Sequence, residues 1–422
     1  MNEYFHSVTL DKDLCKGCTN CLKHCPTEAI RIRNGKAKII NERCIDCGEC
    51  IRICPYHAKK AITDDYEKIF DYKYKIALPA PAFYAQYNDV NIEVLLYALE
   101  LLGFDEVREV TIGADAISKK TDELLSGNLA DKPLISSSCP AIVRLIRIRF
   151  PSLIPNILPL QSPMDIVAKK AKFETAEKLN ISPEEVGIFF ISPCAAKVTS
   201  CKAPIGTTES FVDGVISVSR IVQEIAPFYS KIDKKEHTSK STASGIGWAK
   251  SGGESHQLSS YNSIAVDGIM NVIKLLEDLE DDKIVDIDFI ECCACTGGCV
   301  GGPLTVNNTY IAQANIKKLM KKYTREITTD EFLDEELMLN KTITCEPILK
   351  LSSNMAESIR MMDEIDKLIE KFPGLDCGSC GAPSCSALAE DVVKGFAKES
   401  DCIFIYKEKL KTLMNEMNQL EE

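Results

Sequence analysis

The sequence predicts a multidomain protein in which an N-terminal α+β segment and a small helical C-terminal segment flank a central α/β domain. Three observations support this fold class. The 422 residues exceed what one hydrophobic core usually supports. Strand-like and helix-like stretches alternate in the middle of the chain, which is typical of α/β layers with largely parallel sheets. The 20 cysteines gather near the start, in the middle and near the end. We place the domains at residues 1–72, 73–345 and 346–422.

Composition excludes several classes of protein. The formal charge of -12 is spread among interspersed acidic and basic residues, so neither a nucleic-acid footprint nor a membrane-surface patch is expected. The N-terminal stretch lacks the pattern of a secretory signal, and no apolar run approaches a membrane span. We expect a cytoplasmic protein whose cysteines are reduced and bind metal rather than form disulfides.

The first segment contains one four-cysteine motif twice, as CKGCTNCLKHCP and CIDCGECIRICP. Both read C-x2-C-x2-C-x3-C-P, the run of bacterial ferredoxins, in which three cysteines bind one [4Fe-4S] cube and the fourth binds the other. Zinc knuckles also use C-x2-C pairs, but two complete runs ending in proline favour iron and sulfur. IRIRNGKAKII between the runs predicts a hairpin that turns at Asn34 and Gly35. The pattern assigns one cube to Cys15, Cys18, Cys21 and Cys54, and the second to Cys44, Cys47, Cys50 and Cys25.

Strand-like runs in the central segment end beside further cysteines. YKIALPAPAF, from Tyr74, reads as a buried strand, and VNIEVLLYALELLGF reads as an amphipathic helix. PLISSS precedes Cys139, GIFFISP precedes Cys194, and IVDIDFIECCA precedes Cys295 and Cys299. Because sites gather at strand ends in α/β folds, these cysteines mark a candidate site.

The central segment resembles a known family. SSSCPA, SPCAAK and ECCACTGGCVGG resemble the three signature segments of [FeFe]-hydrogenases, in the same order and at similar separations. LPAPAF, LLGFDEV, GADAI, QSP and SGGESH are supporting matches. The resemblance covers the ferredoxin-like segment and nearly all of the chain from Tyr74 to about Val306.

The resemblance implies an H-cluster, which is a [4Fe-4S] cube joined to a diiron subsite with CO, cyanide and a dithiolate. Its cube would be bound by Cys139, Cys194, Cys295 and Cys299, and Cys299 would also bridge to the diiron subsite. Lys197 matches a family lysine whose ammonium pairs with a cyanide ligand, although a surface lysine is the alternative. Pro81, Ala82 and Ser162 match walls of the family site and could equally be packing features.

The sequence departs from the family's proton path. Ser138 replaces the cysteine that precedes the first cube ligand, and an alcohol is a much weaker acid than a thiol. Leu158 aligns with the family's relay serine. Glu123 in TDELL matches the inner glutamate, but Lys120 stands where the outer glutamate belongs. The resemblance therefore implies a broken or rerouted proton path.

Other residues differ from the family around the diiron subsite. Ser192 and Cys293 stand where the family commonly has methionines. Cys293 is a candidate substitute proton donor, or alternatively a buried small hydrophobic residue. Cys201, Cys292 and Cys345 have no partner at ligand spacing and are expected to be structural free thiols.

The C-terminal segment predicts a helix followed by a further cysteine group. Met355, Ile359, Met362, Ile365 and Ile369 fall on one face of a helix that ends near Pro373. GLDCGSCGAPSC follows it, and the spacing C-x2-C-x4-C-x16-C resembles small [4Fe-4S] domains of corrinoid iron-sulfur proteins and electron-transport subunits. Zinc is the alternative metal, but the interleaved glycines favour iron and sulfur. The expected ligands are Cys377, Cys380, Cys385 and Cys402.

These features predict an iron-sulfur oxidoreductase that interconverts H2 with protons and electrons, slowly because of the altered proton path. The altered path and the terminal cluster resemble the sensory branch of the family. The expected partners are a ferredoxin or another redox or signalling protein, together with hydrogenase maturation proteins. One alternative is a bulk ferredoxin-linked hydrogenase, and another is a non-catalytic hydrogenase-like protein of cluster assembly or electron transfer.

Overall fold

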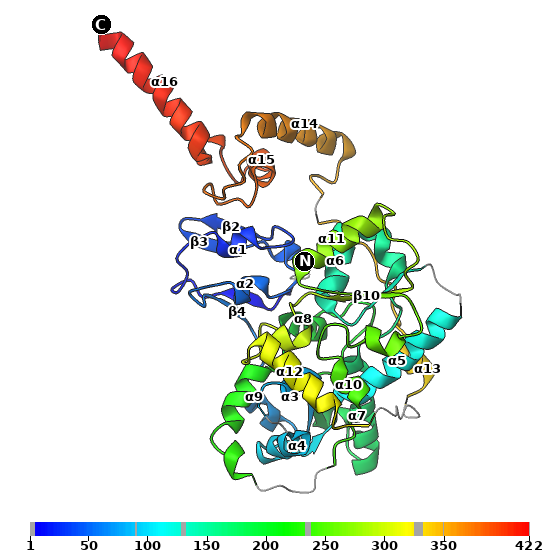
Figure 1. Ribbon diagram of the computed structural model, residues 1–422. Coiled ribbons are helices and arrows are strands. Elements are labelled where there is room, and N and C mark those ends of the chain that lie inside the picture. The colour runs from blue at the N-terminus through cyan, green and yellow to red at the C-terminus, as the bar shows by residue number, and fades with distance from the viewer. Residues whose placement is uncertain are drawn as a thin grey trace. The chain divides into compact units, whose positions relative to one another are not determined.

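The computed structural model describes residues 5–88, 91–127, 132–232, 238–324, 332–348 and 350–421 (Figure 1). The chain forms two compact units. The larger unit comprises Met1–Val8, Ile45–Gly48 and Ala61–Cys345. The smaller unit comprises Thr9–Cys44, Glu49–Lys60 and Glu346–Glu422. No helix in the described part of the chain combines the length and the apolar character needed to cross a membrane.

The larger unit contains a four-stranded parallel sheet in the order β6-β5-β8-β9. Its strands are β5 (Tyr74–Pro79), β6 (Glu106–Val107), β8 (Val186–Ser192) and β9 (Gly214–Ser217). Every residue of β8 is buried, as expected for a continuous apolar run in a sheet that is covered on both faces. The predicted parallel α/β architecture is confirmed.

A three-stranded parallel sheet lies in the same unit, in the order β10-β11-β7. Its strands are β7 (Leu134–Ile135), β10 (Ser263–Asp267) and β11 (Phe289–Cys293). The strand before Cys139 is only two residues long. Ser136 still continues the pairing, because its amide donates to the Ile290 carbonyl at 3.0 Å.

Alternating side chains of the four-stranded sheet enter two apolar cores. Phe189 and Ile191 of β8 belong to one core, and Ile188 and Phe190 belong to the other. Helices α4, α9 and α12 contribute to the first core, and α5 and α7 to the second. The helices of the larger unit are α3 (Pro81–Tyr84), α4 (Ile92–Leu101), α5 (Val110–Ser126), α6 (Pro140–Arg149), α7 (Pro163–Leu179), α8 (Ala195–Lys202), α9 (Val218–Ile225), α10 (Ala243–Gly247), α11 (Ile269–Glu280), α12 (Thr309–Met320) and α13 (Asp334–Leu337).

Local signals explain where these helices begin and end. The Asn91 side chain accepts a hydrogen bond from the Glu93 amide at 2.9 Å and so caps α4. The predicted helix also included Val90, which lies outside the described residues. Ser162 caps α7, Pro163 takes its first position, and Asn180 ends it in the left-handed conformation with φ 51°.

The N-terminal segment contains two small sheets and two short helices. Strands β2 (Ile30–Arg33) and β3 (Lys36–Ile39) pair antiparallel. Asn34 and Gly35 turn with φ of 52° and 71°, which confirms the predicted hairpin. Strand β1 (Val8–Leu10) pairs with β4 (Lys59–Ala61), and the helices are α1 (Asn20–Lys23) and α2 (Glu49–Arg52).

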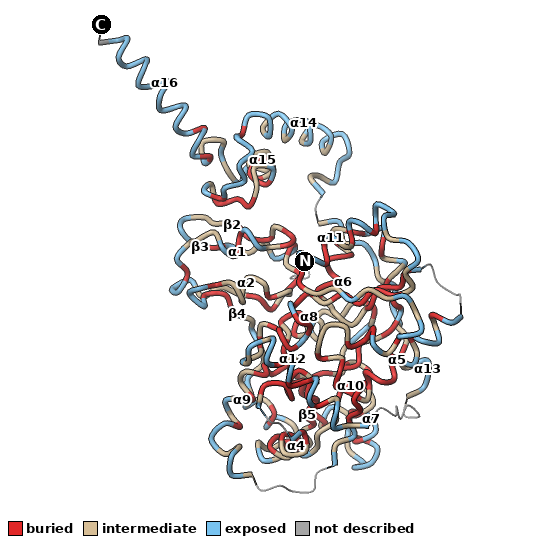
Figure 2. The backbone as a smooth tube through the Cα atoms, in the orientation of Figure 1, coloured by how far each residue is buried: buried red, intermediate tan, exposed pale blue. Residues whose placement is uncertain are grey.

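The C-terminal segment forms α14 (Met355–Lys371), α15 (Cys385–Val393) and α16 (Ile403–Glu421). Helix α14 ends two residues before Pro373, close to the predicted position. Its predicted apolar face is largely solvent-exposed, with Met355 at 77% and Ile359 at 61% (Figure 2). A small core between α14, α15 and the cysteine loop contains Phe372, Leu388 and Cys402.

Candidate metal centre

The cysteines that follow the central strands converge on one cavity of the larger unit. Cys139 stands after β7 at the start of α6, and Cys194 stands after β8 at the start of α8. Cys295 and Cys299 follow β11. All four line a cavity of about 120 Å³. The carboxyl ends of strands from both sheets thus bring together the four predicted cube ligands.

The walls of this cavity are mainly apolar. They include the side chains of Val110, Met164, Phe190 and Trp248. Such walls exclude water and strengthen any electrostatic interaction inside the cavity.

The thiols of the cavity lie close enough to affect one another. Burial, together with Cys139, raises the pKa of Cys194 to about 11. Burial, with Cys194 and Cys139, raises the pKa of Cys299 to about 12. Cys299 retains exposed surface and lines the cavity. Such a cluster of thiols fits a metal group, because bound metal ions stabilise the thiolate form.

Lys197 lies on α8, three residues after Cys194, and lines the same cavity. Among the described residues, its ammonium has no hydrogen-bond or carboxylate partner. An ammonium without a counterion at an apolar cavity fits an anionic ligand.

Glycines bring the backbone close to the cavity after β11. Gly298 has φ 85°, and a Cβ atom there would lie 2.4 Å from the Ser251 nitrogen. At Gly302 a Cβ atom would lie 2.2 Å from the Pro193 carbonyl oxygen. Larger residues at these positions would displace the segment that holds Cys299.

The other predicted wall residues occupy different positions. Ser138 and Pro81 line the cavity, whereas Ala82 is fully buried in the neighbouring core. Ser192 is buried, and its hydroxyl donates to the Cys194 carbonyl and accepts from the Cys194 amide, both at 3.0 Å. Ser162 lines an adjacent smaller pocket together with Lys197, and it caps α7.

Three residues of the predicted proton path lie away from the cavity wall. Lys120 forms ion pairs with Glu123 at 2.9 Å and Asp334 at 2.8 Å near the surface. Hydrogen bonds to Asp334 and Glu123 raise the pKa of Lys120. Leu158 is buried in an apolar core. Among these three residues, none lines the cavity.

Two acidic residues that the sequence did not single out line the cavity instead. Glu254 and Glu291 are both buried, at 4% exposure each. The Ser136 hydroxyl donates to Glu254 Oε2 at 2.7 Å, and Glu254 Oε1 has no partner among the described residues. Burial and the charge of Glu291 raise the pKa of Glu254.

Of the two glutamates, Glu291 also lies close to Cys293. Its carboxylate accepts from the amides of Gly252 at 2.9 Å and Ser255 at 2.8 Å. The Cys293 thiol lies 3.8 Å from Glu291 Oε1 and also lines the cavity. Burial raises the pKa of Glu291 and of Cys293. A glutamate inside the apolar run FIECC was the available sequence signal for Glu291, since a buried strand rarely carries a charge.

The remaining central cysteines are distributed differently. Cys292 is buried and lines the cavity. The Cys201 thiol lies 3.9 Å from Met164 Sδ, and burial raises its pKa to about 12. Cys345 is exposed.

The first N-terminal cysteine set also comes together. Burial raises the pKa of Cys21 to about 11, and Cys18, Cys54 and Cys15 lie close enough to add to the effect. Backbone amides donate to thiols, from Ala37 to Cys15 at 3.5 Å and from Ala58 to Cys54 at 3.3 Å. These are the contacts expected around iron-sulfur ligands.

Of the second set, Cys25 accepts from the Ala29 amide at 3.2 Å, and Cys44 and Cys50 belong to the smaller unit. Cys47 lies in the segment Ile45–Gly48 and lines the cavity of the larger unit.

Asp46 anchors the segment that carries Cys47. Its carboxylate accepts from the Thr199 hydroxyl at 2.7 Å and the Val8 amide at 2.9 Å, and Arg144 lies 3.4 Å away. Burial opposes its ionisation, but hydrogen bonds from His6, Thr199 and Val8 hold the pKa of Asp46 below its ordinary value.

The C-terminal cysteines gather in the smaller unit. Burial raises the pKa of Cys380, and Cys377 and Cys402 lie close enough to contribute. Cys380, Cys385 and Cys402 pack in one small apolar core, whereas Cys377 is exposed.

Family models match the three parts of the chain. The model "Iron only hydrogenase large subunit, C-terminal domain" matches residues 73–303. A "4Fe-4S dicluster domain" model matches residues 7–55, and an Fe-S cluster model matches residues 372–404.

Individual proteins are similar as well. Iron hydrogenase 1 of Clostridium pasteurianum is 25% identical over 395 residues, which cover 76% of this chain and 68% of that protein. The periplasmic [Fe] hydrogenase large subunit of Nitratidesulfovibrio vulgaris is 31% identical over 212 residues, which cover 46% of this chain and 50% of that protein. The chain thus spans about half the length of the second relative. A solved structure of an [FeFe]-hydrogenase HydA1 variant from Chlamydomonas reinhardtii matches the fold with a TM-score of 0.50 at 18% identity, covering 65% of this chain and 95% of that one.

Proposed function

Because the chain belongs to the iron-only hydrogenase family, we propose that it interconverts H2 with protons and electrons at an H-cluster in the cavity of the larger unit. The observation that carries this proposal is the convergence of Cys139, Cys194, Cys295 and Cys299 on one apolar cavity beside the Lys197 ammonium. In this proposal the four cysteines would hold the cube, and Cys299 would also hold the diiron subsite. When bound, the diiron subsite supplies an open coordination position for the heterolytic cleavage of H2.

The chain's own residues hold and orient this group. Lys197 places a fixed positive charge where anionic ligands would lie. The backbone beside Pro81 forms a further wall, and the Ser192 hydroxyl fixes the backbone of Cys194 through two hydrogen bonds. Ser162 and Ala82 act on the site through the packing of α7 and α3, not by contact with the cavity.

Electrons reach the cavity beside Cys47. This cysteine lines the cavity wall, and Asp46 fixes its segment to α6 and α8 through Arg144 and Thr199. We assign the N-terminal clusters to Cys15, Cys18, Cys21 and Cys54, and to Cys44, Cys47, Cys50 and Cys25.

Protons reach the cavity through Glu254 and Glu291 in this proposal. Both carboxyl groups line the cavity and have raised pKa values, so they can hold a proton at a pH where an ordinary carboxyl is ionised. Gly252, whose amide donates to Glu291, also lines an open surface pocket with Lys250 and His256. Cys293 and Ser138 stand at the inner end of this route, and Glu123 is not part of it.

A rerouted proton path favours slow turnover and a role in H2 sensing over bulk H2 metabolism. The Ser138 hydroxyl is a poorer acid than a thiol, and Leu158 carries no exchangeable proton. A bulk ferredoxin-linked hydrogenase and a non-catalytic assembly or electron-transfer protein are the competing functions. The cation at the cavity and the glycines around Cys299 favour the hydrogenase, because an electron-transfer protein requires neither.

We retain three domains, residues 1–72, 73–345 and 346–422, as part of this proposal. The partners would be a ferredoxin or other redox or signalling protein and the maturation proteins that insert the diiron subsite. We also propose a cytoplasmic, reducing location, since 20 cysteines without a disulfide in the described chain suit one.

A turnover assay tests the proposed reaction. The chain loaded with iron, sulfide and a synthetic diiron unit should evolve H2 from a reduced viologen and oxidise H2 in reverse. The Cys299→Ser variant should lose both reactions, whereas Cys345→Ser, at an exposed cysteine, should keep them. Equal rates in the Cys299→Ser variant would contradict the proposal.

A further inference from the structure

Within the smaller unit, the C-terminal cysteine loop packs directly on strand β2. The Ile32 amide donates to the Gly381 carbonyl at 2.8 Å. Gly381 has φ 80°, and a Cβ atom there would lie 2.1 Å from the Ile32 carbonyl oxygen. The two backbones are therefore in contact at a point that only glycine permits.

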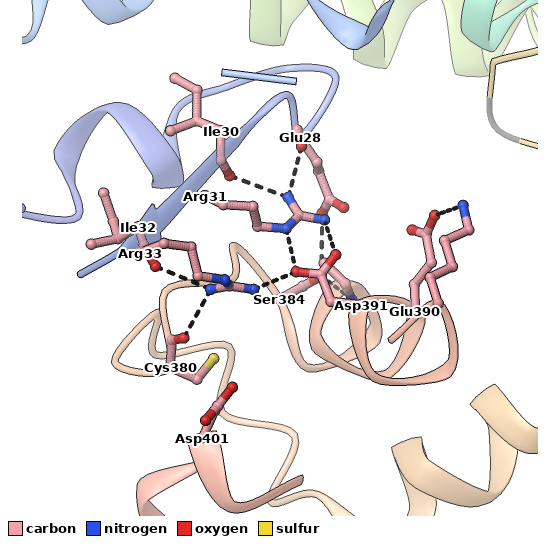
Figure 3. A network of polar contacts seen from close by, with 12 residues as sticks. Glu28, Ile30, Arg31, Ile32, Arg33, Cys380, Ser384, Glu390, Asp391 and Asp401 are labelled. Carbon is pink, nitrogen blue, oxygen red and sulfur yellow. Dashed lines mark hydrogen bonds and ion pairs between the residues drawn. The ribbon is translucent and has the colours of Figure 1, made fainter. Parts of the chain in front are cut away.

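A buried charge cluster holds this contact together (Figure 3). Asp391 of α15 accepts from Arg31 through both oxygens, at 2.7 and 3.1 Å, and from Arg33 at 2.6 Å. The Asp391 side chain is 8% exposed and that of Arg31 is 5% exposed. Arg33 also donates to the carbonyl of Cys380, one of the predicted ligands, at 3.2 Å. A bidentate pair of this kind fixes orientation as well as distance.

The loops that carry two predicted cluster sites touch each other. A Cβ atom at Gly378, which follows Cys377, would lie 3.1 Å from a methyl carbon of Leu22 and 3.4 Å from one of Thr19. Thr19 and Leu22 flank Cys21. Lys23, the last residue of α1, donates to the carbonyls of Asp376 and of Pro383, the latter at 2.9 Å.

We propose that the ion pairs of Asp391 with Arg31 and Arg33, called the clamp below, hold the C-terminal cluster against the Cys15–Cys21 segment. The C-terminal cluster is then the entry point of an intramolecular electron relay. One electron from an external one-electron carrier reduces the C-terminal cluster, beside the exposed Cys377. That electron then passes to the cluster of Cys15, Cys18, Cys21 and Cys54, which is reduced as the C-terminal cluster is reoxidised. No proton or bond change accompanies the transfer. The relay rests on the iron-sulfur centres of the proposed function but not on its diiron subsite.

Electron paramagnetic resonance of the full chain, loaded with iron and sulfide but without a diiron unit, tests the relay. After reduction with dithionite, we expect magnetic interaction between the C-terminal cluster and one N-terminal cluster. The Cys377→Ser/Cys380→Ser double variant should remove that interaction and leave the other cluster signals. A wild-type spectrum equal to the sum of isolated clusters would overturn the proposal, as would a C-terminal loop that binds no iron.

A matched pair of variants tests the clamp. Asp391→Asn removes the charge between Arg31 and Arg33, whereas Asp363→Asn makes the same change at an exposed pair with Lys367 on α14. We expect Asp391→Asn to weaken the magnetic interaction, to slow reduction of the N-terminal clusters by a photochemically reduced viologen at least tenfold, and to speed hydrogen exchange at the Ile32 amide. Asp363→Asn should change none of these.

The iron content decides how the Asp391→Asn result is read. If this variant loses iron, Arg33→Gln, which leaves the Arg31 pair intact, should give the same weakening with full iron content. Unchanged coupling and rate with full iron content in both variants would overturn the clamp. Missing CO and cyanide bands after diiron loading would contradict the proposed function and leave these cluster measurements unaffected.

Discussion

Ser138 places a hydroxyl on the cavity wall, one residue before Cys139. A thiol has a pKa of roughly 8.5 and exchanges protons at neutral pH far more readily than an alcohol. We expect Ser138→Cys to raise H2 evolution several-fold in a viologen-coupled assay. Ser137→Cys is the control, because Ser137 donates to the Leu160 carbonyl and lines the adjacent pocket instead. An unchanged rate in Ser138→Cys would show that this step does not limit turnover.

Glu254 and Glu291 are expected to carry protons to the cavity. Removing a positioned proton carrier typically costs about 10²- to 10⁴-fold in rate. Glu254→Gln and Glu291→Gln should each lower turnover by at least tenfold while the iron content stays unchanged. Glu123→Gln alters a surface ion pair and should leave the rate unchanged. A rate loss in Glu123→Gln alone would show that protons follow the family's usual path and not Glu254 and Glu291.

The raised pKa of Glu254 determines the direction in which stability and H2 evolution change with pH. The folded protein holds this proton to a higher pH than the unfolded chain, whose carboxyl ionises at roughly pH 4.3. The contribution of Glu254 to the free energy of unfolding therefore falls as the pH rises from roughly 4.3, the unfolded value, to the raised pKa of the folded protein. H2 evolution that draws on this proton should fall as the pH passes the raised pKa. The difference in rate between wild type and Glu254→Gln should shrink there, as a pH profile of both proteins would measure.

Residue chemistry was only partly predictable from the sequence. The four cysteines could be placed at one site because each follows a strand-like run, and Lys197 was added to it by the resemblance to the hydrogenase family. Glu254 and Glu291 could not, because their chemistry depends on burial among segments distant in sequence. Glu123 was expected at the inner position of the family's path and Lys120 at the outer one. Both instead pair with each other near the surface, and Lys120 also pairs with Asp334, more than 200 residues away in the chain.

At the scale of elements, the loop after β11 depends on backbone contact at Gly298. A Cβ atom there would meet the backbone of Ser251 and Lys250 at 2.4 to 2.6 Å, and these atoms cannot move aside as a flexible side chain would. We expect Gly298→Ala to destabilise the larger unit by more than about 2 kcal/mol and to lower iron binding. Denaturant unfolding and iron analysis would measure both effects.

Gly252→Ala provides the matched control. Gly252 also has a positive φ, of 76°, but a Cβ atom there would have only the Ala265 Cβ nearby, at 3.8 Å. Only the cost of the left-handed conformation remains, about 1 kcal/mol. Equal losses in the two variants would show that strain, and not close backbone approach, determines the effect at Gly298.

The longer elements were predictable because their patterns are strong. Strand β5 is mainly apolar, β8 is a continuous apolar run, and the hairpin at Asn34 and Gly35 has a specific turn signal. The face of α14 shows the limit of periodicity, because the apolar spacing predicts a helix but not whether its face is covered. The contact of Gly381 with Ile32 had no sequence signal, since it joins residues of opposite ends of the chain.

At the scale of the whole molecule, the two units differ in how much they depend on metal. The larger unit has two extensive apolar cores, whereas the N-terminal core is small and includes Cys15, Cys21 and Cys54 themselves. Three buried thiols without metal stabilise a fold poorly, and metal binding supplies folding free energy in such small domains. We expect iron removal to unfold the smaller unit and to leave the parallel sheets of the larger unit protected.

Hydrogen exchange of the metal-free chain would check this difference. Amides of β2, β3 and α15 should exchange rapidly, while amides of β5 and β8 remain protected. Uniform loss of protection, or uniform retention, would contradict the division into a metal-dependent unit and a self-supporting one.

Infrared spectroscopy of the chain after loading with a diiron unit tests the central claim most directly. If Cys139, Cys194, Cys295 and Cys299 hold an H-cluster beside Lys197, the spectrum should show sharp CO and cyanide bands. These bands should shift in Lys197→Met, which removes the cation, and should be absent in Cys299→Ser. A wild-type protein with intact [4Fe-4S] clusters and no CO or cyanide bands would contradict the hydrogenase function.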